Sequence, residues 1–164
     1  EQAADTAASD EEEVLEHKIA EYAAFITKQD PAFTVEELEE AMQKVMDQYA
    51  GGIGTHYQFN EKQLAMAEEK IKKLQILAKG LAAVDMHELM FIYELKERLT
   101  VCLTVIAHLR ARKETRWHSF AENLDYPEKS DAWLCYVNSK KNGDQITMIR
   151  RDLVKGGETY EHRD

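Results

Sequence analysis

Residues 85–113 read DMHELMFIYELKERLTVCLTVIAHLRARK, and this stretch decides the fold. Its apolar residues recur every three or four positions, which is the spacing of one face of an α-helix. Asp85 is a residue type that caps helix N-termini, so we expect the helix to begin there. If it runs to about Lys113, it is about 40 Å long at about 1.5 Å per residue. The residues that share its apolar side are Leu89, Ile92, Leu99, Cys102, Leu103, Ile106 and Leu109.

Two shorter helices are expected before this one. Thr34 and Glu37 have capping-box spacing, and the helix that they begin should end at Gly51-Gly52. Asn60 is placed to cap the next helix, and Gly80 is placed to terminate it. The apolar stripes of these two helices are Val35, Leu38, Met42, Val45 and Tyr49, and then Leu64, Ala67, Ile71, Leu74 and Ala78.

A further helix is predicted near the N-terminus. Asp10 and Glu13 favour a helix start, and the helix should end before Asp30-Pro31, because the residue before proline is disfavoured in the α region. We expect residues 1–9 to be frayed or disordered. The apolar residues of this helix are Leu15, Ile19, Tyr22 and Ile26. Helices joined by short turns pack side by side, so residues 10–113 are predicted to form an antiparallel, spectrin-repeat-like bundle of three to four helices.

The pattern changes at residue 114. Helical spacing disappears, and two β-prone runs, 133–138 and 145–150, flank Asn142-Gly143, a strong hairpin signal. Residues 114–164 are therefore predicted to be an extended tail with a β-hairpin at about 132–151. A lone hairpin is marginally stable in water, so the tail must lie against another surface. The fold class is mainly α.

Charge and composition exclude several functions. The 164 residues carry 31 acidic and 21 basic side chains, a net charge of −10, and all of the excess lies in residues 1–50, with 14 acidic and 3 basic side chains. Nucleic-acid binding is therefore not expected, because it requires clustered Lys and Arg. No apolar stretch is long enough to span a bilayer, so we expect no membrane insertion. Cys102 and Cys135 do not form a disulfide framework, which favours a cytoplasmic setting. Because the chain begins at Glu1, we expect a piece of a longer polypeptide.

The sequence contains no convincing catalytic motif. Residues 51–57 resemble a dinucleotide-binding loop, but they follow a helix instead of a strand, and Tyr57 takes the place of the third glycine. His87-Glu88 begins like a zinc-protease motif, but Phe91 stands where the second histidine is required. We therefore assign no catalytic, cofactor-binding or metal-binding residue to this chain.

Residues 108–118, HLRARKETRWH, are the most unusual polar segment. Cations at the end of the long helix suit the negative end of its dipole. The same residues could instead form a polar docking surface, in which arginine forks pair with another domain. The aromatic tail that follows also requires a partner surface.

Several segments together resemble the C-terminal helical domain of the succinate dehydrogenase and fumarate reductase flavoprotein family, and most closely its adenylylsulfate reductase alpha-subunit branch. Arg112-Lys-Glu-Thr-Arg116 resembles the Arg-x-Glu-Ser-Arg motif of that family, with Thr in place of Ser. Asp125-Tyr-Pro127 and Asp131-Ala-Trp-Leu134 follow in the family order. The segments that resemble the sulfur branch are 46–57, 85–89 and 133–139. After Arg116 the wider family has Gly-Ala-His where this chain has Trp117-His118-Ser119, which leaves the substrate open.

The resemblance implies a non-catalytic domain of a larger FAD-dependent oxidoreductase. The parent flavoprotein would bind FAD in a separate domain of the same polypeptide, and this domain would pack on it. An iron-sulfur subunit, which carries the iron-sulfur clusters, would exchange electrons with the flavin. The residues expected to dock between domains are Arg112, Glu114, Thr115, Arg116, Gly51 and Gly52. The alternative is a free-standing acidic helical adaptor protein, whose acidic face recruits a basic partner.

Overall fold

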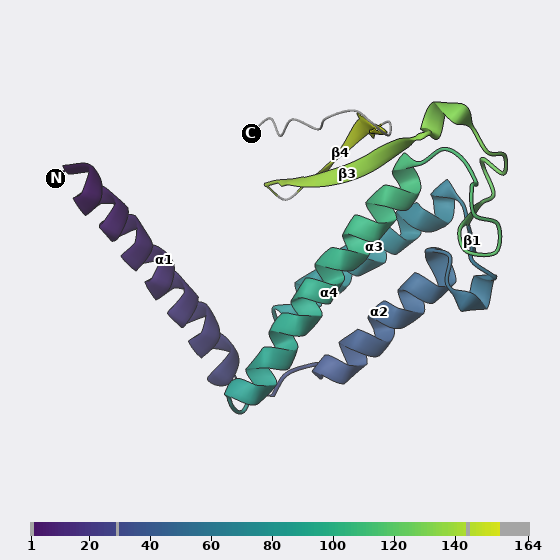
Figure 1. Cartoon of the computed structure of the whole chain (residues 1–164). Helices are drawn as coiled ribbons and strands as arrows, with labels where there is room; N and C mark the ends of the chain where they lie inside the picture. Colours follow the sequence, from purple (N-terminus) through teal and green to yellow (C-terminus); the bar gives the residue numbers. More distant parts are fainter. Residues whose placement is uncertain (1, 29, 144, 155–164) are drawn as a thin grey trace.

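The computed structural model describes residues 2–28, 30–143 and 145–154. Figure 1 shows a group of helices side by side, a helix near the N-terminus that projects away from them, and a β-hairpin that lies along one side of the group. The helices are α1 (Gln2–Ile26), α2 (Val35–Tyr49), α3 (Glu61–Ala78) and α4 (Met86–Ala111). The strands are β1 (Gln58–Phe59), β2 (Glu122–Asn123), β3 (Cys135–Asn142) and β4 (Gln145–Asp152). Two short 3₁₀ turns, η1 (Ile53–Thr55) and η2 (Asp131–Trp133), lie between these elements.

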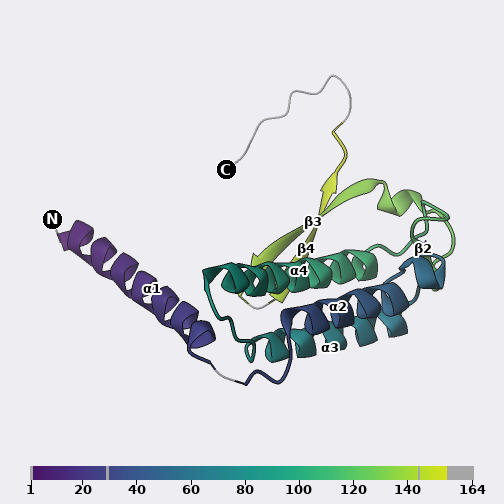
Figure 2. The same cartoon turned by 90° about the horizontal axis from the view of Figure 1, so that it is seen from below.

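The core lies among α2, α3 and α4, which form an antiparallel bundle (Figure 2). The predicted stripe of α3 is buried along its whole length, and Leu38 and Met42 of α2 pack against it. Four residues of the predicted α4 stripe, Leu89, Ile92, Leu99 and Ile106, are buried, and Cys102, Leu103 and Leu109 pack at the edge of the core. The predicted mainly helical fold is therefore confirmed, with three helices sharing the core.

The helix ends follow the capping residues of the sequence. Thr34 forms a complete capping box with Glu37, since each side chain accepts a hydrogen bond from the other residue's backbone amide. Asn60 accepts from the Gln63 amide, and the Asp85 carboxylate accepts from two amides of the first turn of α4. Within the described residues, no helix combines the length and apolar character needed to cross a membrane.

Helix α1 differs from the expectation in two ways. It begins at Gln2, so residues 2–9 of the predicted frayed start are helical here, and residue 1 lies outside the described residues. The alanines of this segment favour helix, and its acidic residues suit the positive end of the helix dipole. The second difference is that α1 does not lie along the bundle: the described contacts with α4 are made by Glu21, Tyr22 and Phe25 near its C-terminal end, and its earlier turns project outward (Figure 1). The predicted bundle of residues 10–113 thus reduces to α2, α3 and α4.

The C-terminal hairpin is present, with a small shift. β3 and β4 pair antiparallel from Cys135 opposite Asp152 to Asn142 opposite Gln145. Asn142 is therefore the last residue of β3 and not a central turn residue, and Trp133 belongs to η2 and not to the strand. The hairpin packs against α4, which is the surface that the sequence required. The predicted tail residues 155–164 lie outside the described residues.

Candidate docking site at the end of the bundle

The glycine-rich turn after α2 is shaped by Asp47. The amide of Gly52 donates to the Asp47 carbonyl at 3.2 Å, and the amide of Gly54 donates to the Asp47 carboxylate at 2.9 Å. A Cβ atom on Gly52 would lie 2.3 Å from the Asp47 Cα, so only glycine fits. Gly51 has φ of +76°, a left-handed conformation that glycine adopts without strain. The turn connects α2 to α3, and the Asp47 carboxylate already accepts the Gly54 amide, which a bound phosphate would need as a donor.

A short parallel strand pair joins this turn to the loop after α4. Gln58 pairs with Glu122 and Phe59 with Asn123, so segments 64 positions apart in the sequence lie side by side. The Asp125 carboxylate accepts a hydrogen bond of 2.7 Å from the first amide of α3, at Glu61. The two predicted docking segments are therefore brought together at one end of the bundle.

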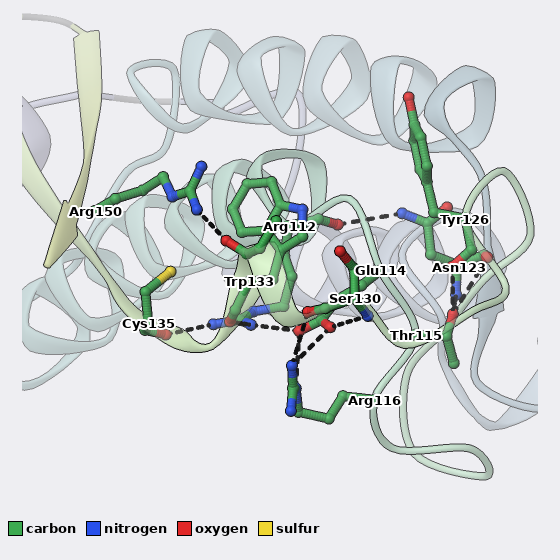
Figure 3. Close-up of polar contacts among 11 residues, drawn as sticks. Arg112, Glu114, Thr115, Arg116, Asn123, Tyr126, Ser130, Trp133, Cys135 and Arg150 are labelled. Carbon is green, nitrogen blue, oxygen red and sulfur yellow. Dashed lines mark hydrogen bonds and ion pairs between the residues drawn. The ribbon is translucent and has the colours of Figure 1, made fainter. Parts of the chain in front are cut away.

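Glu114 lies at the centre of the loop that follows α4. Its side chain has no exposed surface. Its Oε1 atom accepts hydrogen bonds from Arg112 Nη1 at 2.7 Å and Arg116 Nε at 2.9 Å. Its Oε2 atom accepts from Arg116 Nη2 and from the Ser130 amide, both at 2.9 Å (Figure 3). One carboxylate thus links the end of α4, the loop and the start of η2.

These bonds determine the protonation state of Glu114. Burial alone would raise the pKa of its carboxyl, because burial disfavours the charged form. The hydrogen bonds from Arg116, the Ser130 amide and Arg112 outweigh burial and lower the pKa to about 2. Glu114 is therefore ionised at neutral pH and acts as an anionic anchor, not as a proton donor or acceptor.

Thr115 is the second buried polar residue of the loop, with 1% of its surface exposed. Its hydroxyl donates to the Tyr126 carbonyl at 2.9 Å and accepts from the Asn123 amide at 2.9 Å. Its own amide donates to the Glu128 carbonyl. These bonds close residues 115–128 into a loop around the Thr115 side chain.

Arg112 connects the loop to the hairpin. Besides Glu114, its guanidinium donates to the carbonyls of Trp133 at 2.9 Å and Cys135 at 3.1 Å. Arg150 of β4 lies 4.3 Å from the centre of the Trp133 ring and donates to the Ala132 carbonyl. Both arginines thereby hold η2 and the start of β3 at the end of α4 (Figure 3).

Large aromatic side chains are exposed at this end of the bundle. Trp117 and Phe120 are 69% and 74% exposed, and the ring of Tyr57 lies 6.4 Å from that of Phe120. Beside them is a cavity of about 220 Å³. It is lined by Phe59, Leu109 and Val137 and by the Glu114 cluster with its two arginines. We call Tyr57, Trp117 and Phe120 the aromatic rim.

The structure gives the predicted docking residues different accessibilities. Glu114 and Thr115 are covered by their own chain, because their polar atoms bond to the surrounding loop, and they therefore offer no surface to another domain. The side chains of Arg112 and Arg116 remain 33% and 19% exposed, and Gly51 and Gly52 shape the neighbouring turn. Sequence reasoning missed Asp47, Asn123, Ser130 and Arg150. Only Asp47, an acidic residue just before a glycine-rich turn, offered a signal.

A helical bundle closed at one end by an arginine-glutamate cluster, with a β-hairpin along α4, defines the class: a mainly helical domain. A family model described as "Fumarate reductase flavoprotein C-term" matches residues 39–158. The match covers well over half of the chain. The protein therefore belongs to the family of fumarate reductase flavoprotein C-terminal domains.

Individual relatives agree with this membership. The chain is 34% identical over 98 residues to adenylylsulfate reductase subunit alpha of Megalodesulfovibrio gigas, a match of 59% of this chain and 15% of that protein. It is similar to the structure of adenylylsulfate reductase from Archaeoglobus fulgidus, with a TM-score of 0.74 and 35% identity over 82% of this chain and 21% of that chain. An E. coli quinol fumarate reductase structure has a TM-score of 0.70 at 18% identity over 91% of this chain and 26% of that chain, and it supports the fold alone. The chain spans less than a quarter of the length of the adenylylsulfate reductases described here.

Proposed function

We propose that this chain is the C-terminal helical domain of the flavoprotein subunit of a FAD-dependent oxidoreductase, and that it supports assembly without contributing a catalytic residue. The observation that carries the proposal is the Glu114 cluster. Its charged atoms are bonded to Arg112, Arg116 and the Ser130 amide, so the cluster builds a rigid end. The aromatic rim stands on this end, and its side chains are 36–74% exposed.

The chain's own residues do not fit FAD. A dinucleotide pyrophosphate needs free amides at a strand-to-helix turn. Here the turn follows α2, and the Gly54 amide already donates to the Asp47 carboxylate, whose charge would repel phosphate. We therefore place FAD in another domain of the same polypeptide. That domain is proposed to pack on the aromatic rim, with Arg112 and Arg116 at the edge of the contact and the Gly51-Gly52 turn beside it.

The chain does not fit an iron-sulfur cluster either. Such clusters are held by several cysteine thiolates, whereas this sequence has two cysteines, Cys102 on α4 and Cys135 on β3. We therefore propose that iron-sulfur clusters belong to a separate partner subunit. A cytoplasmic location of the assembly stays a proposal that rests on the cysteine usage.

Adenylylsulfate is the substrate class that we propose for the parent enzyme. Identity is 33–35% to the adenylylsulfate reductase structures and 18% to the fumarate reductase structure. One of the former contains the reductase with sulfite as a covalent adduct. A fumarate or succinate oxidoreductase is the second candidate, and it shares the same family.

The test is a substitution of the aromatic rim in the full-length flavoprotein. We expect Trp117→Ala with Phe120→Ala to leave thermal unfolding of the 164-residue chain unchanged, because both side chains are exposed. In the full-length protein the same pair should lower the amount of FAD retained per polypeptide, measured by flavin absorbance after gel filtration. Ile76→Ala is the matched control, since Ile76 is 65% exposed on α3. Full FAD retention in the double variant would refute docking at the rim.

A further inference from the structure

The described contacts between helix α1 and the bundle are made by the last turns of α1. Phe25 is buried, and its carbonyl accepts a 3.0 Å hydrogen bond from the Ala83 amide in the α3–α4 connection. The Tyr22 ring packs edge-on against Tyr93 of α4 at 5.2 Å. Lys96 of α4 forms an ion pair of 2.6 Å with Glu21. The earlier turns of α1 project away from the bundle (Figures 1 and 2).

The projecting part carries an apolar stripe that the described residues leave uncovered. Leu15, Ile19, Tyr22 and Ile26 follow one another at helical spacing, and 36–60% of their surface is exposed. The stripe runs into the Tyr22 contact with α4, so a covering surface would reach α4 as well. A long helix whose apolar side is packed only at one end gains little stability from that packing. The α1 stripe, defined by these four residues, therefore requires a partner.

The charges beside the stripe restrict what the partner can be. Residues 11–21 contain five glutamates and one lysine. Glu12 and Glu16 precede Leu15 and Ile19 by three positions, so they border the stripe. A second copy of this chain would bring like charges together along such a contact, which is destabilising. The fitting partner is an apolar surface bordered by Lys or Arg.

We propose that the α1 stripe packs against the domain that precedes it in the flavoprotein polypeptide, and that this contact is separate from the one at the aromatic rim. The inference rests on the proposed function. The matching family model describes a C-terminal region, and this chain spans 15–24% of the length of its reductase relatives. The remaining polypeptide would connect through α1, so it would meet the stripe at the high effective concentration of a tethered domain. The preceding domain would thereby contact this domain at both ends of the bundle, through the α1 stripe at one end and the aromatic rim at the other.

Cysteine labelling in the full-length flavoprotein tests this contact. Ile19→Cys reports on the stripe, and Ala20→Cys, which is exposed on the other side of α1, is the matched control. Phe120→Cys reports on the aromatic rim. The maleimide labelling rate of each site is measured by peptide mass spectrometry in the 164-residue chain and in the full-length protein. We expect labelling at position 19 to slow by about tenfold or more in the full-length protein, as for a site that needs local opening, and labelling at position 20 to stay fast.

The outcomes separate the two proposals. Equal labelling of Ile19→Cys in both proteins, with Phe120→Cys slowed, would overturn the α1 contact and leave the proposed function standing. Equal protection of positions 19 and 20 would overturn the stripe as the specific contact face. Absence of FAD together with fast labelling at position 120 would overturn the proposed function, and the inference would fall with it.

Discussion

The two ends of the molecule satisfy their side chains in opposite ways. In the loop after α4, the polar side chains of Arg112, Glu114 and Thr115 are bonded within their own chain. Along α1, the apolar side chains of Leu15 and Ile19 are exposed. The polar segment that the sequence marked as a docking surface is thus largely internal, and the apolar helix that the sequence placed in the core stands outside it.

This difference between the two ends shows what crowded opposite charges and apolar periodicity in a sequence each indicate. Charged residues of opposite sign crowded into a short segment, such as residues 112–116, can satisfy one another and build a scaffold. Apolar periodicity shows that a face is buried, but it does not show whether the burial is within the chain or against another domain.

The strongest test of the scaffold is Glu114→Ala. The substitution leaves Arg112 and Arg116 without their shared counter-ion and the Ser130 amide without an acceptor. Removing one partner of a buried ion pair costs about 3–5 kcal/mol in the free energy of unfolding. Denaturant titration of the 164-residue chain measures this loss. Glu128→Gln, an exposed control in the same loop, should change stability by less than about 0.5 kcal/mol. A loss below about 1 kcal/mol for Glu114→Ala would show that the Glu114 cluster does not stabilise the fold as an internal scaffold.

Acid titration tests the same carboxylate with its partners left in place. The pKa of Glu114 is lowered from 4.5 to about 2. A group whose pKa is lower in the folded state contributes stability above its unfolded pKa, and this contribution is lost as the pH falls. The chain should therefore lose stability progressively from about pH 4.5 towards pH 2. Glu114→Gln should flatten this dependence in thermal unfolding measured by circular dichroism, and an unchanged slope would show that other carboxylates cause it.

Most of the fold could be predicted from the sequence because local signals agreed with each other. The capping box at Thr34 and the stripe of α3 each specified an element, and short turns forced these helices together. The hairpin was signalled by β-prone runs on both sides of Asn142-Gly143. The projection of α1 could not be predicted, because its stripe has the same period as that of a core helix, and the connection at 27–34 does not fix its direction.

The candidate site was predictable only in part. The sequence pointed to residues 112–116 and to Gly51-Gly52, and the structure brings both to one end of the bundle. Their joining depends on the pairing of Phe59 with Asn123, a two-residue strand contact far too short to leave a periodic signal. The Ser130 amide, the third partner of Glu114, was equally hidden, because no residue type marks a backbone amide as a hydrogen-bond donor to a particular side chain.

Gly52→Ala tests whether the glycine turn is as tightly fixed as the loop beside it. The added Cβ would lie 2.3 Å from the Asp47 Cα and 2.8 Å from its carbonyl oxygen, both backbone atoms that have little room to move. Overpacking of this kind costs about 1–3 kcal/mol, and we expect the upper part of that range. Differential scanning calorimetry measures it. Gly80→Ala is the control, because its nearest neighbour is a single carbonyl oxygen at 3.1 Å. Equal melting temperatures for the two variants would show that the turn adapts.

A smaller loss is expected for Thr115→Val. The substitution keeps the shape of the side chain but leaves the Asn123 amide and the Tyr126 carbonyl without the hydroxyl. An unsatisfied buried polar group costs about 1–3 kcal/mol. Urea titration should show a loss of about 2 kcal/mol. The control is Thr100→Val on the exposed face of α4, whose hydroxyl donates to the Lys96 carbonyl at 3.1 Å within the same helix. Equal losses in the two variants would show that the Thr115 hydroxyl stabilises the fold no more than a hydroxyl on an exposed helix face does.

The smallest effect is expected in α1. Ile19→Ser removes an apolar side chain that is 57% exposed, and Ile and Ser have similar helix propensities, so the chain alone should change by no more than about 0.5 kcal/mol. The same substitution at Ile71, which is fully buried in α3, removes core packing and should cost several kcal/mol. Urea titration of both variants gives the two values. A large loss at position 19 in the isolated chain would mean that α1 folds back onto the bundle, and the contrast between the two ends would then disappear. A small loss leaves the apolar stripe of α1 without a role inside this chain, which is the property expected of a surface that another domain covers.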